Sequence, residues 1–298
     1  MGAEQIPLSG GWIDRDVATR GSEDALERAW RDPDATILRL CGSTIPITTT
    51  DVSRRLALIP TAGFSAHPHE RIFLGRRDGA PVFAVSVANE QCDVVPAEWL
   101  HPFDVALELV PAERELVVIA SALVRWHESA RLSTRDGEPT HLADGGWSRR
   151  DSRGGELFPR TDPAVIVLIE HDEKVLLGSN ALWESGRFSL LAGFVEVGET
   201  LEQAVAREIF EESGMRLGEI TYVGSQPWPF PRSLMLGFRA RLEEGQDPNA
   251  LVPDPQEISE LRWFTRAELA NPPAGIRLPG SLSISGWLIA DWVAEGTR

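Results

Sequence analysis

Three glutamates near residue 210 have a spacing that suits metal binding. Glu208, Glu211 and Glu212 stand at i, i+3 and i+4, which places their side chains on one side of a helix. Like charges this close repel one another, and Arg207 offsets only part of the repulsion. A hard divalent cation would offset the rest, since Mg²⁺ typically binds one or two carboxylates together with substrate phosphates. The alternative is a solvated acidic helix face, and the glutamates alone do not separate the two readings.

The helix that must carry these glutamates is marked at both ends. Thr200 with Gln203 forms the pattern of a capping box, and Gly214 is a typical residue just past a helix end. The apolar residues between them recur at every fourth position and should face the core: Leu201, Val205 and Ile209. These signals predict a helix from about residue 201 to residue 213.

The glutamates belong to a longer pattern, G-x5-E-x7-R-E-U-x-E-E-x-G-U, in which U is aliphatic. Its fixed positions are Gly193, Glu199, Arg207, Glu208, Ile209, Glu211, Glu212, Gly214 and Met215. On these residues the chain resembles the Nudix hydrolases. The resemblance implies a loop–helix–loop on an α/β/α sandwich with a mixed sheet. It also implies bound Mg²⁺ or Mn²⁺, and hydrolysis of a diphosphate linked to another group.

A second motif follows ten residues later and combines prolines with aromatic residues. Residues 225–233 read SQPWPFPRS, and the alternating prolines make this segment stiff and extended. Trp228 and Phe230 would present flat faces on which a base or nicotinamide ring can stack, with Gln226 and Ser233 as polar contacts. Two alternatives remain: a polyproline ligand for a partner domain, and a rigid loop whose aromatic rings pack into the core.

Together the two motifs resemble the NADH pyrophosphatase family. The resemblance extends to residues 158–163, 254–257 and 283–285, and more loosely to 73–85. By motif position it implies metal ligation by Glu208, Glu212, Glu257 and the Ala192 carbonyl. It implies that Glu211 takes a general-base or third-metal role, oriented by Arg207. The residues that would line the dinucleotide site are Phe158, Phe194, Gln226, Pro227, Trp228, Pro229, Phe230, Pro231, Arg232, Ser233 and Ser285.

The chain departs from the family between its two domains, where many relatives carry a four-cysteine zinc ribbon. Residues 126–160 contain no cysteine, so we expect no zinc. Two alternatives remain for this segment. Either an Asp–Arg network takes the place of the metal, or the segment is a disordered linker. The network would use Asp136, Arg149, Arg150, Asp151 and Arg153. His67, His69 and Glu70 have ligand-like spacing, but Pro68 separates the histidines and we expect surface-loop residues.

The fold class expected from these patterns is α+β in three parts. Residues 1–125 would form a mostly β N-terminal α+β domain, residues 126–160 a degenerate zinc-ribbon-like linker, and residues 161–298 the C-terminal Nudix domain. In the first part, strand-like runs stand at 36–40, 71–75 and 81–85, and a helical pattern covers 113–127.

Composition narrows the classes of function. The 298 residues hold 29 basic and 45 acidic side chains, a net charge of −16, which argues against non-specific binding to nucleic acid or anionic membranes. No apolar run approaches the ~18 residues of a membrane span. The N-terminal residues lack a secretory pattern. The two cysteines exclude a disulfide scaffold and fit a reducing compartment, so we expect a cytoplasmic protein without a membrane partner.

The expected function is Mg²⁺- or Mn²⁺-dependent hydrolysis of NADH or NAD⁺ to nicotinamide mononucleotide and AMP. NAD-capped RNA 5′ ends present the same bond and rank second, because the acidic balance disfavours tight binding of the RNA body. One alternative is hydrolysis of ADP-ribose or dinucleoside polyphosphates. Another is a non-catalytic nucleotide-sensing or interaction module, against which the intact glutamates argue. The family resemblance also implies a homodimer.

Overall fold

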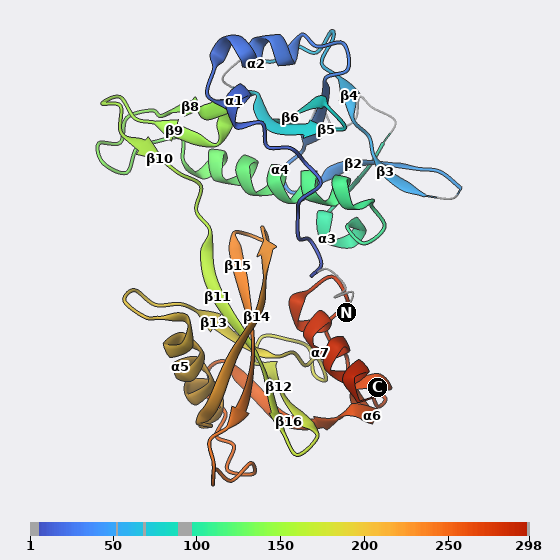
Figure 1. The fold of residues 1–298 in the computed structure, drawn as a ribbon, viewed down its shortest axis with the longest axis vertical. Coiled ribbons are helices and arrows are strands. Elements are labelled where there is room, and N and C mark those ends of the chain that lie inside the picture. Colours follow the sequence, from blue (N-terminus) through green and yellow to red (C-terminus); the bar gives the residue numbers. More distant parts are fainter. Residues whose placement is uncertain (1–5, 52, 68–69, 89–96, 297–298) are drawn as a thin grey trace. The chain divides into compact units, whose positions relative to one another are not determined.

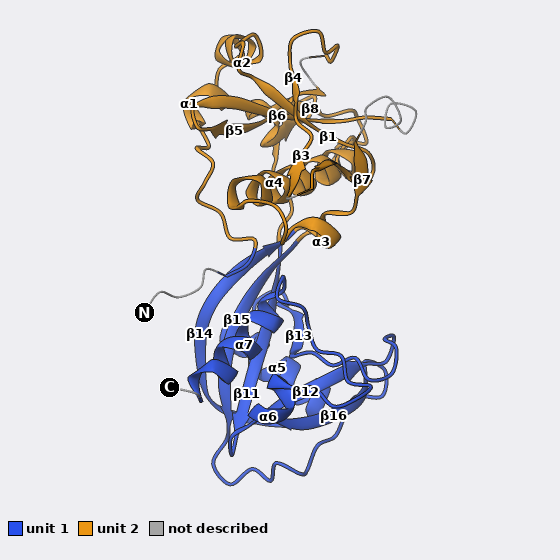
Figure 2. Cartoon of the chain, turned by 90° about the vertical axis from the view of Figure 1, so that its right-hand side faces the viewer, with its two compact units in different colours: residues 1–7, 162–228, 233–298 blue, residues 8–161, 229–232 orange. Residues whose placement is uncertain are grey.

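The computed structural model describes residues 6–51, 53–67, 70–88 and 97–296, which fold into two compact units (Figures 1 and 2). Unit 1 comprises residues 1–7, 162–228 and 233–298, and unit 2 comprises residues 8–161 and 229–232. Among the described residues, no helix is both long and apolar enough to span a membrane.

Unit 1 is built on a six-stranded mixed sheet in the order β14-β15-β11-β12-β16, with β13 paired to β11. Its strands are β11 (Asp162–His171), β12 (Lys174–Asn180), β13 (Leu191–Phe194), β14 (Leu217–Trp228), β15 (Ser233–Leu242) and β16 (Ile258–Thr265). Strands β11 and β15 run parallel, and the other pairs are antiparallel. The predicted mixed sheet is confirmed.

Helices cover both faces of this sheet. Helix α5 (Leu201–Ser213) packs on one face, where Val165 and Val167 of β11 are fully buried. Helices α6 (Arg266–Ala270) and α7 (Ile284–Glu295) lie on the other face, where Ile166 and Leu168 are buried. Successive side chains of a strand point to opposite faces of the sheet. Because helices cover both faces, β11 is apolar along its whole buried length. The expected α/β/α sandwich is confirmed.

Unit 2 combines three small sheets with a long helix, and the cysteine-free segment forms the third of these sheets. The first sheet has the order β4-β1-β6-β5 and the second the order β3-β2-β7. Their strands are β1 (Thr36–Leu40), β2 (Ile45–Thr49), β3 (Arg54–Leu56), β4 (Ile59–Pro60), β5 (Ile72–Arg77), β6 (Ala80–Ser86) and β7 (Glu98–Leu100). The helices are α1 (Val17–Arg20), α2 (Glu23–Trp30), α3 (Pro102–Val105) and α4 (Pro111–Ser129). The α4 side chains Leu116 and Ala120 pack with Leu38 and Leu74 of the first sheet in one buried core.

The cysteine-free segment is ordered and belongs to unit 2. It forms the antiparallel strands β8 (His141–Ala143), β9 (Ser148–Arg150) and β10 (Glu156–Leu157) with a short 3₁₀ turn at Asp144–Gly146. This differs from the disordered-linker alternative, because ladder bonds and turns satisfy the backbone of this segment.

Two turns in this segment are joined by crossed ion pairs. Arg135 of the first turn lies 3.6 Å from Asp151 of the second, and Arg153 of the second lies 3.7 Å from Asp136 of the first. Asp151 also accepts hydrogen bonds from the backbone N–H groups of Arg153 and Gly155, at 2.9 and 2.7 Å. These contacts connect three members of the predicted Asp–Arg network: Asp136, Asp151 and Arg153.

The two other arginines of the predicted network point elsewhere. Arg149 is buried and donates to Thr140 and His127, whereas Arg150 pairs with Glu156 at 3.3 Å. His67 is exposed, and its backbone N–H donates to Glu70. Pro68, His69 and Cys92 lie outside the described residues.

Candidate functional site

Local sequence positions helix α5, which carries the three glutamates. The Thr200 hydroxyl accepts from the Gln203 N–H at 3.3 Å, and the Gln203 side chain accepts from the Thr200 N–H at 2.9 Å, so the predicted capping box is confirmed. Gly214 ends the helix with φ 70°, a conformation that glycine adopts without strain. The buried Val205 and Ile209 fix the rotation of the helix and turn its acidic side toward strand β13.

Arg207 connects this helix to the loop before it. Its Nε and Nη2 atoms donate to the two oxygens of Glu199 at 2.6 and 2.9 Å. Nη1 lies 2.9 Å from Glu211 and 3.0 Å from Glu208, and Nη2 also donates to the Phe194 carbonyl at 2.9 Å. The fork on Glu199 lowers the pKa of that carboxyl to about 2, and the same bonds raise the pKa of Arg207.

Glu212 is a buried carboxyl group in surroundings that disfavour its negative charge. Its side chain is 6% exposed, and its Oε2 atom is buried without a hydrogen-bond partner. Burial first, and then the carboxylates of Glu208, Glu257 and Asp254, raise its pKa to about 8, against a lowering by the Ala192 N–H. A buried carboxylate in this state is stabilised either by a proton or by a cation.

Glu208 shares this environment. Burial raises its pKa, Arg207 lowers it, and Glu211 and Glu257 raise it again. A Cβ atom on Gly193 would lie 2.0 Å from the Glu208 carboxyl carbon, so only glycine at this position of β13 lets the carboxylate approach the backbone. This explains the first glycine of the motif.

Glu257 reaches the site from another part of the chain. It ends a turn opened by Asp254, is exposed, and contributes to the field at both Glu208 and Glu212. Asp254 is an additional carboxylate that the metal-ligand prediction omits, although the family resemblance extends to residues 254–257, which include it.

The donor set fits a hard divalent cation in kind. The carboxylates of Glu208, Glu212 and Glu257 supply oxygen ligands, and one buried oxygen of Glu212 has no partner. Among the described residues, no group of three or more acidic, histidine or cysteine side chains is arranged to hold a metal ion as it stands. A cation would therefore bind by drawing on the carboxylate cluster and would not enter a preformed metal site.

Two residues expected to contact a dinucleotide, Gln226 and Ser285, are buried and hydrogen-bonded within unit 1. Gln226 is fully buried, and its amide nitrogen donates to the carbonyls of Pro7 and Leu282 at 2.7 and 2.9 Å, while its oxygen accepts from the Ile284 N–H. Both amide hydrogens are thus used. Ser285 is also buried, and its hydroxyl lies 2.9 Å from that of Ser189.

The rest of the proline–aromatic motif is divided between the units. Pro227, Trp228 and Ser233 belong to unit 1, where Trp228 pairs with Ser233 across β14 and β15. Residues 229–232 belong to unit 2: Pro229 is buried, Pro231 and Arg232 are exposed, and Phe230 packs against His101 and Phe103 with ring centroids 5.6 and 6.4 Å apart. Phe158 and Phe194, which the family resemblance also places in the lining of the dinucleotide site, are 62% and 59% exposed.

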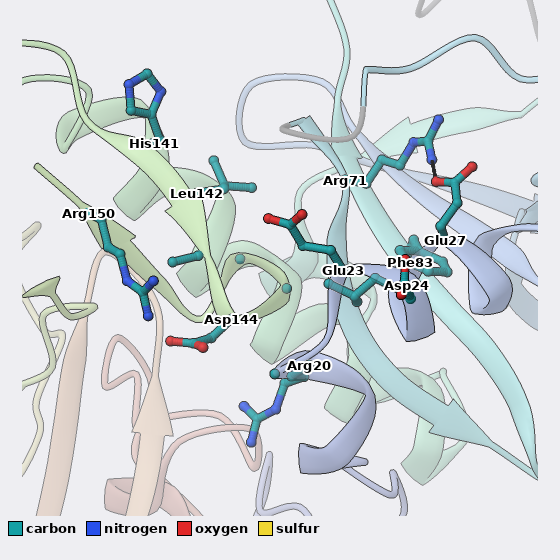
Figure 3. Close-up of a pocket in the computed structure, with 15 residues that line it drawn as sticks. Arg20, Glu23, Asp24, Glu27, Arg71, Phe83, His141, Leu142, Asp144 and Arg150 are labelled. Carbon is teal, nitrogen blue, oxygen red and sulfur yellow. Dashed lines mark hydrogen bonds and ion pairs between the residues drawn. The ribbon is translucent and has the colours of Figure 1, made fainter. Parts of the chain in front are cut away.

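A cavity of about 720 Å³ in unit 2 does not share the chemistry of this site (Figure 3). Charges of both signs line it: Arg20, Arg71, Arg150, Glu23, Asp24, Glu27 and Asp144. Arg71 pairs with Glu27 inside it at 3.0 Å, and Arg150 is paired with Glu156. Opposite charges therefore largely offset one another here, whereas carboxylates predominate at the α5 site.

Comparison with known proteins agrees with the α5 site. Residues 160–281 match the NUDIX domain. The NAD-capped RNA hydrolase NudC of Mycobacterium bovis (BCG Pasteur) is 44% identical over 243 residues, which cover 76% of each chain. The protein of that name from Stutzerimonas stutzeri is 36% identical, covering 74% of this chain and 77% of the relative. A solved Nudix hydrolase from Nitrosomonas europaea is 28% identical, with a TM-score of 0.35, and the match covers 46% of this chain and 72% of that chain. The first relative's identity and coverage show that the chain belongs to the NADH pyrophosphatase family of Nudix hydrolases.

Proposed function

We propose that this protein hydrolyses the diphosphate of NADH and NAD⁺ to nicotinamide mononucleotide and AMP, and the same bond at NAD-capped RNA 5′ ends. The relatives named NAD-capped RNA hydrolase support the substrate class. The observation that carries the proposal is Glu212, a buried carboxylate with an unpartnered oxygen in a field of other carboxylates. That arrangement suits a cation that also binds phosphates.

Glu208, Glu212, Glu257 and the Ala192 carbonyl would hold Mg²⁺ or Mn²⁺. When bound, such an ion neutralises phosphate charge and lowers the pKa of the attacking water. The carboxylates disfavour an anionic substrate by themselves, so we expect activity to require the ion.

Glu211 would accept the proton of the attacking water. Its side chain is 54% exposed, so water reaches it, and Arg207 holds one of its oxygens at 2.9 Å. The water oxygen bonds to one phosphorus, the bridging P–O bond breaks, and the electron pair leaves with the other phosphate. Glu199 keeps Arg207, and through it Glu211, in position.

Product analysis tests the proposal. Wild type and Glu212→Gln are incubated with NADH, NAD⁺, ADP-ribose or NAD-capped RNA, each with Mg²⁺ or Mn²⁺. We expect nicotinamide mononucleotide and AMP-ended products from wild type only. Cleavage of ADP-ribose alone would favour the alternative hydrolase, and nucleotide binding without any product would favour a sensor.

The proposal includes a cytoplasmic homodimer. The family resemblance supports the dimer, and an intracellular nucleotide substrate supports the location. Sedimentation equilibrium at several concentrations tests the oligomeric state, and a monomer at all of them would refute the dimer.

A further inference from the structure

A short loop of unit 1, residues 181–187, begins directly beside the carboxylate cluster. The Ala181 N–H donates to the Glu257 carbonyl at 2.7 Å, and Asn180 pairs with Ile258 at the end of the β12–β16 ladder. The backbone of the loop is therefore fixed relative to a residue that the proposed function places at the metal.

The loop is held in one conformation by its own hydrogen bonds. Asn180 accepts from the backbone N–H groups of Leu182 and Trp183 at 2.9 and 3.0 Å. At its other end the Arg277 N–H donates to the Gly186 carbonyl at 2.7 Å. Gly186 has φ 82°, and a Cβ there would lie 2.0 Å from the Gly275 carbonyl oxygen, so the turn requires glycine. A ligand that binds the loop would therefore have to order little of its backbone.

Two arginines lie side by side here, one at the end of the loop and one in the segment bridged to it. The Arg187 guanidinium lies 4.6 Å from the centroid of the Trp183 ring, and a β-bridge places Arg187 beside Arg277. Both arginines are exposed. Glu184 pairs with Arg277 and neutralises part of this charge. Leu182 adds an apolar side chain that is 92% exposed.

We propose that Arg187 and Arg277, with Trp183, bind the RNA chain that follows the NAD cap. The inference rests on the proposed function and names a substrate contact for the same site. Guanidinium groups bind phosphodiesters through paired N–H donors, and exposed apolar and aromatic side chains suit unstacked bases. NADH has no such chain beyond its adenosine. The loop should therefore favour capped RNA as a substrate over the free dinucleotide.

Two substitutions with opposite expected signs test the proposal. Arg187→Ala removes a phosphate contact, whereas Glu184→Gln releases Arg277. Arg216→Ala is the matched control, since Arg216 is an exposed arginine of unit 1 that also lies over an aromatic ring, Phe210, at 5.0 Å. We measure kcat/KM for NADH and for a NAD-capped 20-nucleotide RNA. Anisotropy with a labelled 5′-monophosphate RNA measures binding without catalysis.

We expect Arg187→Ala to lower kcat/KM for capped RNA about three- to tenfold and Glu184→Gln to raise it, with NADH kinetics unchanged in both. The slope of log K against log salt for RNA binding should become shallower by about 0.7 for Arg187→Ala, the value of one single-strand phosphate contact. Arg216→Ala should change neither. Equal losses on NADH and RNA, or unchanged RNA binding in both loop variants, would overturn the proposal. If wild type cleaves neither substrate, the proposed function fails, and the binding experiment still decides the role of the loop.

Discussion

The guanidinium of Arg207 and the carboxylate of Glu199 form a two-bond fork, although eight positions separate the residues. The fork ties the loop before α5 to the helix and leaves Nη1 directed at Glu208 and Glu211. Paired bonds of this kind fix direction as well as distance. Arg207 is therefore a positioning residue for the acidic cluster.

Arg207→Lys and Glu199→Gln should impair catalysis in the same way. Lysine cannot form the fork, and glutamine loses its charge, so either change frees Glu211 to move. We expect kcat to fall about 10- to 100-fold with a modest change in KM. Because both residues act through one contact, the double variant should lose little more than either single variant. Additive losses in steady-state kinetics would show independent roles.

Glu212→Gln should separate catalysis from stability. Without the carboxylate we expect kcat to fall by two decades or more, about 2.7 kcal/mol, because stabilisation of the phosphate charge is lost. The Mn²⁺ concentration for half activity should rise. Near-normal kcat at saturating Mn²⁺ would remove Glu212 from the catalytic cluster and leave α5 with a solvated acidic face.

The same variant should change how stability depends on pH. Burial raises the pKa of Glu212 to about 8 in the folded protein, against an ordinary value of 4.5. Its contribution is therefore fully present below pH 4.5 and is lost as pH rises toward 8, by about 5 kcal/mol at most. In chelator, wild type should become less stable across this window and Glu212→Gln should not. Parallel profiles from denaturant unfolding would contradict this.

Local signals in the sequence predicted α5 to the residue. Thr200, Gln203 and Gly214 mark its ends through contacts within a few positions, and such contacts are readable from sequence. The role of Gln226 was not readable, because its partners Pro7, Leu282 and Ile284 stand 219, 56 and 58 positions away. The parallel pairing of β1 with β6 could not be predicted from the sequence for the same reason, because only the folded chain brings these strands together.

Trp228→Ala tests whether this ring contributes to dinucleotide binding. A stacking ring is worth roughly 1–3 kcal/mol, so we expect a higher KM for NADH, or a lower kcat/KM, by about 5- to 160-fold. The fold should survive, because Trp228 is half-buried at the end of β14. A variant that unfolds, or one with unchanged kinetics, would support packing or a polyproline-ligand role instead.

Asp151 should stabilise the β8–β10 segment without a metal. Asp151→Ala removes the acceptor of two backbone N–H groups and one ion pair, so the melting temperature of unit 2 should fall. Asp151→Asn keeps an acceptor oxygen, so it should lower the melting temperature less. Chelator should leave the wild-type melt of unit 2 unchanged, and elemental analysis should find no stoichiometric zinc. One zinc per chain would overturn this.

His127 should make unit 2 sensitive to acid. Its Nδ1 lies 3.0 Å from the Arg149 Nη1, which can only donate, so Nε2 carries the hydrogen and donates to the Gly146 carbonyl at 2.8 Å. Burial first, and then the Arg149 charge, lower the pKa of His127 to about 4, while the Gly146 contact acts in the opposite direction.

A histidine whose folded pKa lies below its unfolded value of 6.5 contributes stability above that value and loses it as pH falls toward 4. The expected loss is about 3 kcal/mol. His127→Gln places a neutral amide at the same position and should flatten the profile between pH 6.5 and 4, while lowering stability at pH 7 by a smaller amount. Trp147 is one of the aromatic residues of unit 2 that contribute to the near-ultraviolet circular dichroism of the folded protein, since its indole N–H donates to the Phe73 carbonyl within that unit. Near-ultraviolet circular dichroism with urea at each pH, on wild type and variant, measures the difference. If wild type and His127→Gln lose stability equally over this window, another group of unit 2 governs its acid sensitivity.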